Sequence, residues 1–420
     1  MVLHRTPLCL AIALTFALLA SGTTAQADEV FKPTSVVTGF GAQSINSFDI
    51  GFVDPRHSVY LLADRTNAAI DVVDTRTNKL IKQLTPGFVG FSGSNDTSGP
   101  NGVLVAEGND VWVGDGNSMI WVIDLQSGNV DATFSTINVA DANRADELCW
   151  DPDDHIILMA NDADKPPFVT FWDSRQSNHF QKLGQITFDG SNPKTPHATN
   201  GIEQCQYDPR SHRFLLNLPE INGPGDNTGN GAVAVINPKN LSKPERIFVL
   251  DHNKCAGPQG MAIGPEGQVL LGCNAPSGVT ATNANGNGNF SSVIIDDHAT
   301  RIVATINDES GPDEVWFNPG DGHYFLARSG AVPPAAVPTQ LLGVIDSSRA
   351  RADQSVYTAN KPNPPASSSH SVAADPVRNQ VYVPIGHNGS STVCGSLGGS
   401  DGTGCIAVYT AQHDEVAKNH

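Results

Sequence analysis

The feature that most constrains the fold of this chain is a short strand pattern that recurs seven times, at steps of about fifty residues. Each copy has a polar residue five positions before a turn, and the turn is usually Asp-Pro, Asn-Pro or Gly-Pro. The copies are SFDIGFVDP, GPNGVLVAEG, RADELCWDP, GIEQCQYDP, GPQGMAIGP, GPDEVWFNPG and SSHSVAADP. Repetition with this period in a chain rich in Val, Ile, Gly and Asn is typical of a β-propeller. The sequence therefore predicts an all-β, seven-bladed β-propeller.

Three further strand patterns follow in each complete repeat, which gives four strands per blade. Second strands such as SVYLLAD precede third strands such as AAIDVVD, which show the alternation of half-buried strands. The last repeat lacks a fourth strand, whereas TSVVTGF at Thr34–Phe40 is a spare strand near the start. We expect this N-terminal strand to complete the last blade and close the ring, so that residues 28–420 form one domain.

Residues 1–27 have the layout of a secretory signal peptide, with Arg5, an apolar run from Leu8 to Ala20 and a small-residue ending. The apolar run is too short to span a bilayer as a helix, and no later segment approaches a membrane span. The sequence therefore predicts a periplasmic or secreted protein.

The cysteines agree with export. Six of them follow the predicted signal peptide, and an even number in an oxidising compartment indicates disulfides. Cys394 and Cys405 flank a Gly/Ser-rich stretch, and Cys255 and Cys273 lie across one hairpin. Cys149 with Cys205 is then the remaining pair.

The formal net charge of −18 limits the partners. Such a surface repels phosphate backbones and anionic lipid, so we expect no nucleic-acid partner. Cations and neutral compounds fit better. We expect a small-molecule ligand or substrate at the channel mouth, and a protein partner is also compatible with this surface.

Alignment of the turns places one polar residue at the start of each innermost strand. Because inner strands line the axial channel of a propeller, these residues should ring one mouth of it. They are Asp49, Asn101, Asp146, Glu203, Gln259, Asp313 and His370. Glu147 and Glu314 directly follow two of them and add negative charge.

Crowded carboxylates are unfavourable unless they share protons or bind a cation. The ring therefore predicts a divalent-cation site, with Ca²⁺ preferred and Mg²⁺ or Mn²⁺ as alternatives. The candidate ligands are Asn101, Asp146, Glu203, Asp313, Asp49, Glu147 and Glu314. The alternative is that these side chains only solvate a water-filled channel.

Two residues are candidates for catalysis at this mouth. His370 is suited to act as a general base on a metal-bound water. Arg328, at the end of a second strand, would either satisfy the carboxylates or grip an anionic substrate group. Other polar residues expected near the mouth are Asp64, Asp115, Asn161, Asn217, Asn274, His387, His197 and His252. The long loops fall on the same face, where binding and catalysis usually reside.

The segment NAAIDVVDTRTNKLIKQL resembles the YVTN-type repeat of bacterial seven-bladed propellers, and this resemblance extends over the chain after residue 27. The arrangement of the mouth is similar to that of gluconolactonase, paraoxonase and diisopropyl-fluorophosphatase propellers. Pro100–Val103 matches the Asn-Gly that begins an inner strand in gluconolactonases, although those families have six blades. The second resemblance implies a channel calcium that polarises an ester or lactone.

Two functional hypotheses follow. The first is a metal-dependent lactone or ester hydrolase, in which Glu203, Asp146, Asn101 and Asp313 hold the cation and His370 activates water. The second is a non-catalytic binding or scaffold propeller of YVTN type, which uses its long loops.

Overall fold

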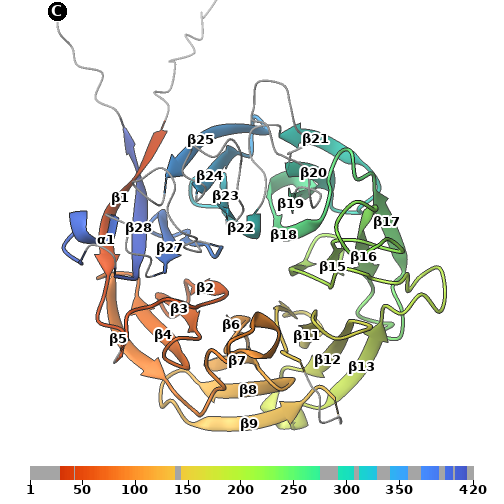
Figure 1. Cartoon of the computed structure of the whole chain (residues 1–420), viewed down its shortest axis with the longest axis horizontal. Helices are drawn as coiled ribbons and strands as arrows, with labels where there is room; N and C mark the ends of the chain where they lie inside the picture. Colours follow the sequence, from red (N-terminus) through yellow and green to blue (C-terminus); the bar gives the residue numbers. More distant parts are fainter. Residues whose placement is uncertain are drawn as a thin grey trace, which may run out of the picture.

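The computed structural model describes residues 29–41, 43–137, 143–274, 292–306, 312–328, 341–357, 370–386, 393–400 and 403–413. These residues form seven four-stranded antiparallel sheets, arranged as blades around a central axis (Figure 1). The predicted seven-bladed propeller is therefore confirmed. The signal peptide predicted for residues 1–27 lies outside the described residues. Within the described ranges no helix is long and apolar enough to cross a membrane.

The strands of each blade follow one another from the axis outward. The inner strands are β2 (Gly51–Asp54), β6 (Val103–Val105), β10 (Leu148–Asp151), β14 (Cys205–Asp208), β18 (Pro258–Ile263), β22 (Pro312–Asn318) and β26 (Ala373–Asp375). The second strands are β3 (Val59–Asp64), β7 (Asp110–Asp115), β11 (Ile156–Asn161), β15 (Arg213–Leu218), β19 (Gln268–Cys273), β23 (His323–Arg328) and β27 (Gln380–Ile385).

The third and outermost strands complete the blades. The third strands are β4 (Ala69–Asp74), β8 (Met119–Asp124), β12 (Phe168–Asp173), β16 (Gly231–Ile236), β20 (Ser292–Asp296), β24 (Leu341–Asp346) and β28 (Cys405–His413). The outer strands are β5 (Lys79–Leu84), β9 (Val130–Ser135), β13 (Lys182–Thr187), β17 (Arg246–Leu250), β21 (Ile302–Ile306), β25 (Arg351–Tyr357) and β1 (Glu29–Val37). Short helical turns lie at η1 (Asn95–Thr97), η2 (Gln176–Asn178), η3 (Pro265–Gly267) and α1 (Val393–Ser396).

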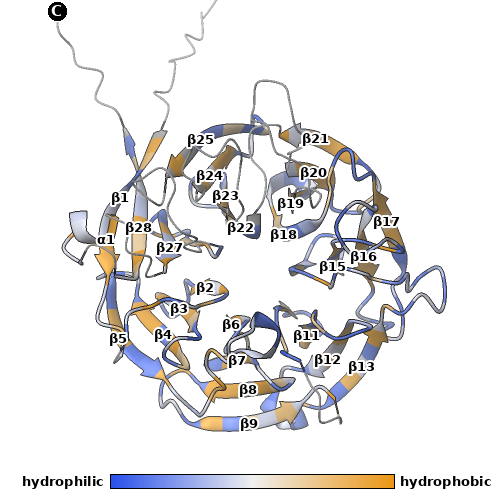
Figure 2. Cartoon of the chain, viewed as in Figure 1, coloured by the Kyte–Doolittle hydropathy of each residue, from blue (hydrophilic) through white to orange (hydrophobic). Residues whose placement is uncertain are grey.

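The core lies between neighbouring blades. Strands β3, β4, β11 and β12 are buried along their whole length, because both faces of a blade pack against other blades. Outer strands such as β13 alternate between exposed and less exposed residues, and Figure 2 shows the matching alternation of hydropathy. The position of a strand therefore explains its sequence pattern. Strands in the middle of a blade are largely apolar, whereas strands at its rim alternate between apolar and polar residues.

The recurrent turn residue after the inner strand has a local role. The Asp54 carboxylate accepts the backbone NH of Arg56 at 3.0 Å, and Asp208 accepts that of Arg210 at 3.0 Å. Such turns are the reason that Asp and Asn are preferred there. We call the end of the ring with these turns the turn face, and the opposite end, where the inner strands begin, the loop face.

The last blade is closed by the N-terminal strand, as predicted. β1 pairs antiparallel with β28 from Glu29–His413 to Val37–Ile406, and the two strands lie side by side in Figure 1. The strand begins and ends earlier than the predicted Thr34–Phe40, and it continues through Pro33 with a register shift. Pro33 is tolerated because β1 is an outermost strand, where a missing backbone NH costs little.

All three predicted cysteine pairs are confirmed as disulfides: Cys149–Cys205, Cys255–Cys273 and Cys394–Cys405. The first joins the inner strands of two neighbouring blades, β10 and β14. The third fixes α1 to β28, next to the seam where the ring closes. The disulfides therefore connect elements within and between blades.

Candidate functional site

The axial channel has two chemically different parts. At the loop face, the residues predicted to ring the mouth do lie at or just before the starts of the inner strands; we call them the polar ring. They are Asp49, Asn101, Asp146, Glu203, Gln259, Asp313 and His370. Further along the channel, toward the turn face, lies an apolar chamber.

Arg65 binds two members of the polar ring. This arginine directly follows β3, and its side chain is 2% exposed. Its Nη2 atom forms an ion pair with Asp49 Oδ2, and Nε donates to Asn101 Oδ1 at 2.9 Å. Burial opposes the ionisation of Asp49, but the Arg65 charge and a hydrogen bond with His370 outweigh it and lower its pKa. Asp49 is therefore a paired carboxylate.

A second arginine, Arg144, binds Asp146. Arg144 Nη2 lies 2.8 Å from Asp146 Oδ2 and 2.9 Å from Asp162 Oδ2. Its Nε also donates to Asp162 Oδ1 at 3.1 Å, which gives a two-point contact. Two of the four carboxyl groups of the polar ring are thus bound by guanidinium groups that the sequence interpretation did not include. Burial nevertheless raises the pKa of Asp146 well above its usual value, against the lowering effect of Arg144.

His370 occupies a defined position in the ring. Its ring stacks on Phe48 with a centroid distance of 4.9 Å and an interplanar angle of 8°. Nε2 lies 3.2 Å from Asp49 Oδ1. This imidazole is therefore oriented by one apolar and one acidic neighbour.

Glu203 and Asp313 hold the remaining carboxyl groups of the ring. Burial raises the pKa of Glu203 well above its usual value, and the negative charge of Asp313 raises it further. Burial also raises the pKa of Asp313, against the lowering effect of His370. This side of the mouth is the more acidic one, because neither arginine forms an ion pair with it among the described contacts.

A bound cation would need several of these groups to converge. Among the described residues no group of three or more His, Cys, Asp or Glu side chains is close enough to hold a metal ion. Arg65 and Arg144 also engage Asp49 and Asp146. The arrangement of the described residues does not fit a ready divalent-cation site, and metal binding stays a prediction.

The other polar residues expected near the mouth have mainly structural contacts. Asp64 accepts the backbone NH of Asn67 at 3.1 Å, and Asp115 accepts Trp121 Nε1 at 3.0 Å. Asn217 Nδ2 donates to the carbonyl oxygen of Gln259 at 2.7 Å and so joins two blades.

Five more residues of that group remain, of which four lie within the described residues. Asn161 Nδ2 donates to the Arg144 carbonyl oxygen at 3.2 Å, and Asn274 Nδ2 donates to Gln259 Oε1. His197 is exposed, and the backbone NH of His252 donates to Asn230 Oδ1 at 3.2 Å. The Arg328 side chain and all of His387 lie outside the described residues, so the proposed role of Arg328 stays a prediction.

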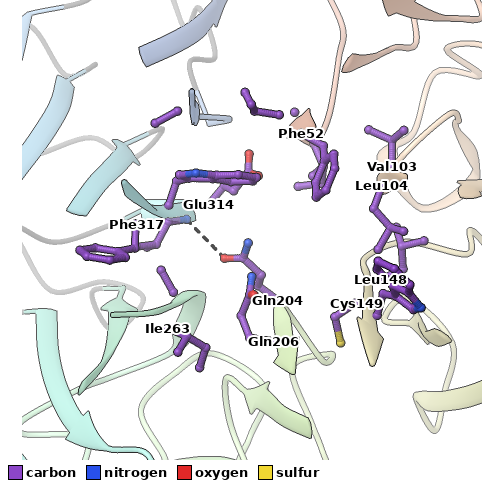
Figure 3. A pocket seen from close by; sticks show the side chains of 18 of the residues that line it. Phe52, Val103, Leu104, Leu148, Cys149, Gln204, Gln206, Ile263, Glu314 and Phe317 are labelled. Atoms are coloured by element: carbon purple, nitrogen blue, oxygen red, sulfur yellow. Dashed lines mark hydrogen bonds between the residues drawn. The ribbon is translucent and has the colours of Figure 1, made fainter. Parts of the chain in front are cut away.

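The apolar chamber is a cavity of about 350 Å³ in the channel. Its walls come from inner strands of several blades and include Phe52, Leu148, Trp150, Ile263, Trp316 and Phe317 (Figure 3). These large side chains are only half-buried. Phe52 packs edge-on against Trp316 with a centroid distance of 5.7 Å. Pro55, Pro319 and Pro376 of the turns line its outer part. The chamber therefore extends toward the turn face.

Two acids and one amide line the inner end of the chamber: Glu147, Gln204 and Glu314. Gln204 Oε1 accepts the backbone NH groups of Met261 at 2.6 Å and Val315 at 3.3 Å, and Figure 3 shows its amide directed into the centre. It therefore connects neighbouring inner strands.

Glu314 is held by its own set of donors. Its Oε2 accepts Ser371 Oγ at 2.6 Å and the backbone NH of Val372 at 3.0 Å. Even so, burial raises the pKa of Glu314 to about 8. Glu147 and Glu314 thus belong to the chamber, one step deeper than the polar ring in which the sequence interpretation had included them.

Sequence reasoning missed the chamber, although a signal for it exists. Aromatic residues occupy one or both of the two positions before the turn in four inner strands. They are Phe52, Trp150, Tyr207, Trp316 and Phe317. In a propeller with short inner strands, such residues face either a neighbouring blade or the axis. Arg65 and Arg144 were missed as well.

Comparison with known proteins does not assign this chain to a family. A scan against protein-family models finds no match for the chain, and a search of curated proteins finds no significantly similar sequence. The seven-bladed architecture is shown, while the YVTN-type and gluconolactonase-like similarities remain resemblances.

Proposed function

We propose that this propeller is a small-molecule-binding protein whose ligand occupies the apolar chamber of the axial channel. The observation that carries the proposal is the set of half-buried aromatic side chains that surround a cavity of about 350 Å³. Cavities of about 300–1,000 Å³ that are mostly apolar, with a few polar groups at one end, are typical ligand sites. Glu147, Gln204 and Glu314 supply those polar groups.

The site is part of the rigid scaffold of the ring. The walls belong to inner strands, and the disulfide Cys149–Cys205 joins two of these strands directly. A ligand would therefore gain apolar burial without ordering a loop, and such preorganisation favours affinity. Export to the periplasm or the cell exterior is part of the proposal, supported by the three disulfides and by the N-terminal sequence pattern.

Filling the chamber should abolish binding. Gln206 lines the cavity from β14 and is half-buried, so Gln206→Trp should occupy part of the space with little effect on folding. A library of small aromatic compounds with neutral, cationic and anionic head groups is screened by thermal shift. Compounds that stabilise the parent, by about 2.7 kcal/mol at about a hundredfold excess over Kd, should fail to stabilise this variant.

Gln126→Trp is the matched control, because Gln126 is exposed in the turn after β8, on the outer part of its blade. It should bind every hit as the parent does. If the hits stabilise Gln206→Trp as well as Gln126→Trp, or if the library yields no hit, the chamber is not the ligand site.

The metal-dependent hydrolase remains a second hypothesis, supported by the crowded acids Glu203 and Asp313. Because the described geometry does not fit a cation, we derive no catalytic step from it. Calorimetric titration of the metal-free protein with Ca²⁺ tests it. Binding that is lost in Glu203→Gln and kept in Glu245→Gln, an exposed acid before β17, would support a cation in the ring. A titration without heat would remove this hypothesis.

A further inference from the structure

Two carboxyl groups of the chamber have unused hydrogen-bonding capacity. Glu147 is 7% exposed, lines the cavity and forms no side-chain hydrogen bond with any other described residue. Glu314 is fully buried, and its Oε1 atom has no partner among the described residues while Oε2 is bound by Ser371 and Val372. Buried polar atoms normally have partners, so unpartnered ones beside a cavity indicate a ligand group.

The titratable groups around these two carboxyl groups are mostly acids. The acids that act on Glu147 are Asp146, Glu203, Glu314 and Asp313, and Asp49 acts on Glu314. Arg65 and Arg144 lie in the polar ring and are already paired with Asp49 and Asp146. An ammonium group placed beside Glu147 and Glu314 would favour the ionised form of these acids, whereas an anion there would disfavour it.

A basic group, Arg56, lies beside the wall residue Trp150 and is itself paired. Its guanidinium lies 5.6 Å from the centroid of Trp150, and Nε contacts Asp54 at 3.0 Å. The side chain is 46% exposed, so solvent screens its charge. Arg56 therefore contributes little positive charge at Glu147 and Glu314.

The walls of the chamber suit a ligand whose cationic end is attached to an apolar body. Phe52, Trp150 and Trp316 present aromatic surface to the cavity. Aromatic faces bind apolar rings by burial, and they also attract ammonium groups through cation–π interactions. Acidic groups at one end and aromatic walls along the sides together match a molecule with a cationic end and an apolar body.

We propose that the chamber binds a monocationic amine with an aromatic body, and that Glu147 and Glu314 pair with its ammonium group. This inference rests on the proposed function, because it names the ligand class for the same cavity. A charge-assisted hydrogen bond is about twice as strong as a neutral one, so the amine should bind about tenfold more tightly than a neutral compound of the same shape.

The test uses three probes with the same aromatic body: 2-phenylethylamine, 2-phenylethanol and 3-phenylpropanoate. Calorimetric titrations at pH 8, where the amine is still protonated, give the three affinities. We expect the amine to bind about tenfold more tightly than the alcohol, and the carboxylate to bind least. Glu147→Gln should remove most of the preference for the amine and leave the affinity for the alcohol nearly unchanged.

Glu245→Gln serves as the matched control and should behave as the parent. Glu314→Gln, which keeps an acceptor for Ser371, is the second variant if Glu147→Gln melts early. Equal affinities for amine and alcohol would overturn the ligand class. They would leave the proposed function intact if Gln206→Trp blocks both probes. Failure of all three probes to bind would also overturn this inference, while the proposed function is judged by the library screen.

Discussion

Replacement of Arg65 by methionine should lower the free energy of unfolding at pH 7 by about 3–5 kcal/mol. The change removes a guanidinium that is 2% exposed and leaves the Asp49 carboxylate buried without its cation. Asn101 Oδ1 also loses the donor at 2.9 Å. An uncompensated buried charge is among the few causes of so large an effect from one substitution. Urea unfolding followed by circular dichroism measures it.

The effect should depend on pH in a defined direction. In the parent, the pKa of Asp49 lies below its usual value of 3.8, so the ion pair stabilises the protein above this pH and is lost as the pH falls. In Arg65→Met the buried Asp49 should have a raised pKa and become neutral on mild acidification. The difference in stability between parent and variant should therefore shrink as the pH is lowered from 7 to 4.

Two controls make the prediction specific. Arg76→Met removes an arginine of the same blade whose side chain is 64% exposed and should leave the stability nearly unchanged. Asp49→Asn combined with Arg65→Met should be more stable than Arg65→Met alone, since it removes the unpaired charge. If the single and double variants are equally unstable, the loss comes from packing, and Arg65 does not serve to neutralise the ring.

Deletion of residues 29–37 should destabilise the whole ring by more than about 5 kcal/mol. The deletion removes β1, which covers β28, and with it Phe31, which is 1% exposed. Phe31 packs edge-on against Phe325 of the neighbouring blade at 5.1 Å. Its backbone NH also donates to Gln354 Oε1 at 2.8 Å. Loss of a buried Phe side chain alone costs about 3–5 kcal/mol.

A synthetic peptide of residues 29–40 provides the matched test of this closure. Added in excess, it should pair with the free edge of β28 and restore most of the thermal stability, as in other cases of strand addition. A scrambled peptide of the same composition should not. A truncated protein that melts at the parent temperature would show that β1 does not hold the ring together.

The fold was predictable because its determinants are local. Largely apolar strands such as β4 recur in every blade, and Asp or Asn caps the inner turn in most of them, so the pattern of one repeat is supported by the others. The third strands were expected to be half-buried, but β4 is buried along its whole length because other blades cover both of its faces. The bounds of β1 were wrong because Pro33 interrupts the strand pattern. Only its position at the edge of the blade makes that residue acceptable.

The candidate site was predictable only in part. The polar ring follows from strand position, and its seven members lie at or just before the starts of the inner strands. Arg65 and Arg144 were not predicted as part of the site, because they lie outside the repeated position and reach the ring with long side chains. The chamber was not predicted for a different reason. Whether Phe52, Trp150 and Trp316 fill the channel or leave space depends on how several blades pack together, which no single repeat encodes.

The seam between β1 and β28 also bears on the time course of folding. It joins residues 29–37 to residues 406–413, so almost the whole chain separates the partners. Contacts between residues so far apart in the sequence form slowly, because the entropy cost of closing a long loop comes before the stabilisation that the contacts provide. During synthesis, the strand that emerges first has no partner until the ribosome has produced nearly all of the remaining chain. The first described strand to be made is thus the last to be placed, and until then both sides of the seam are open edges.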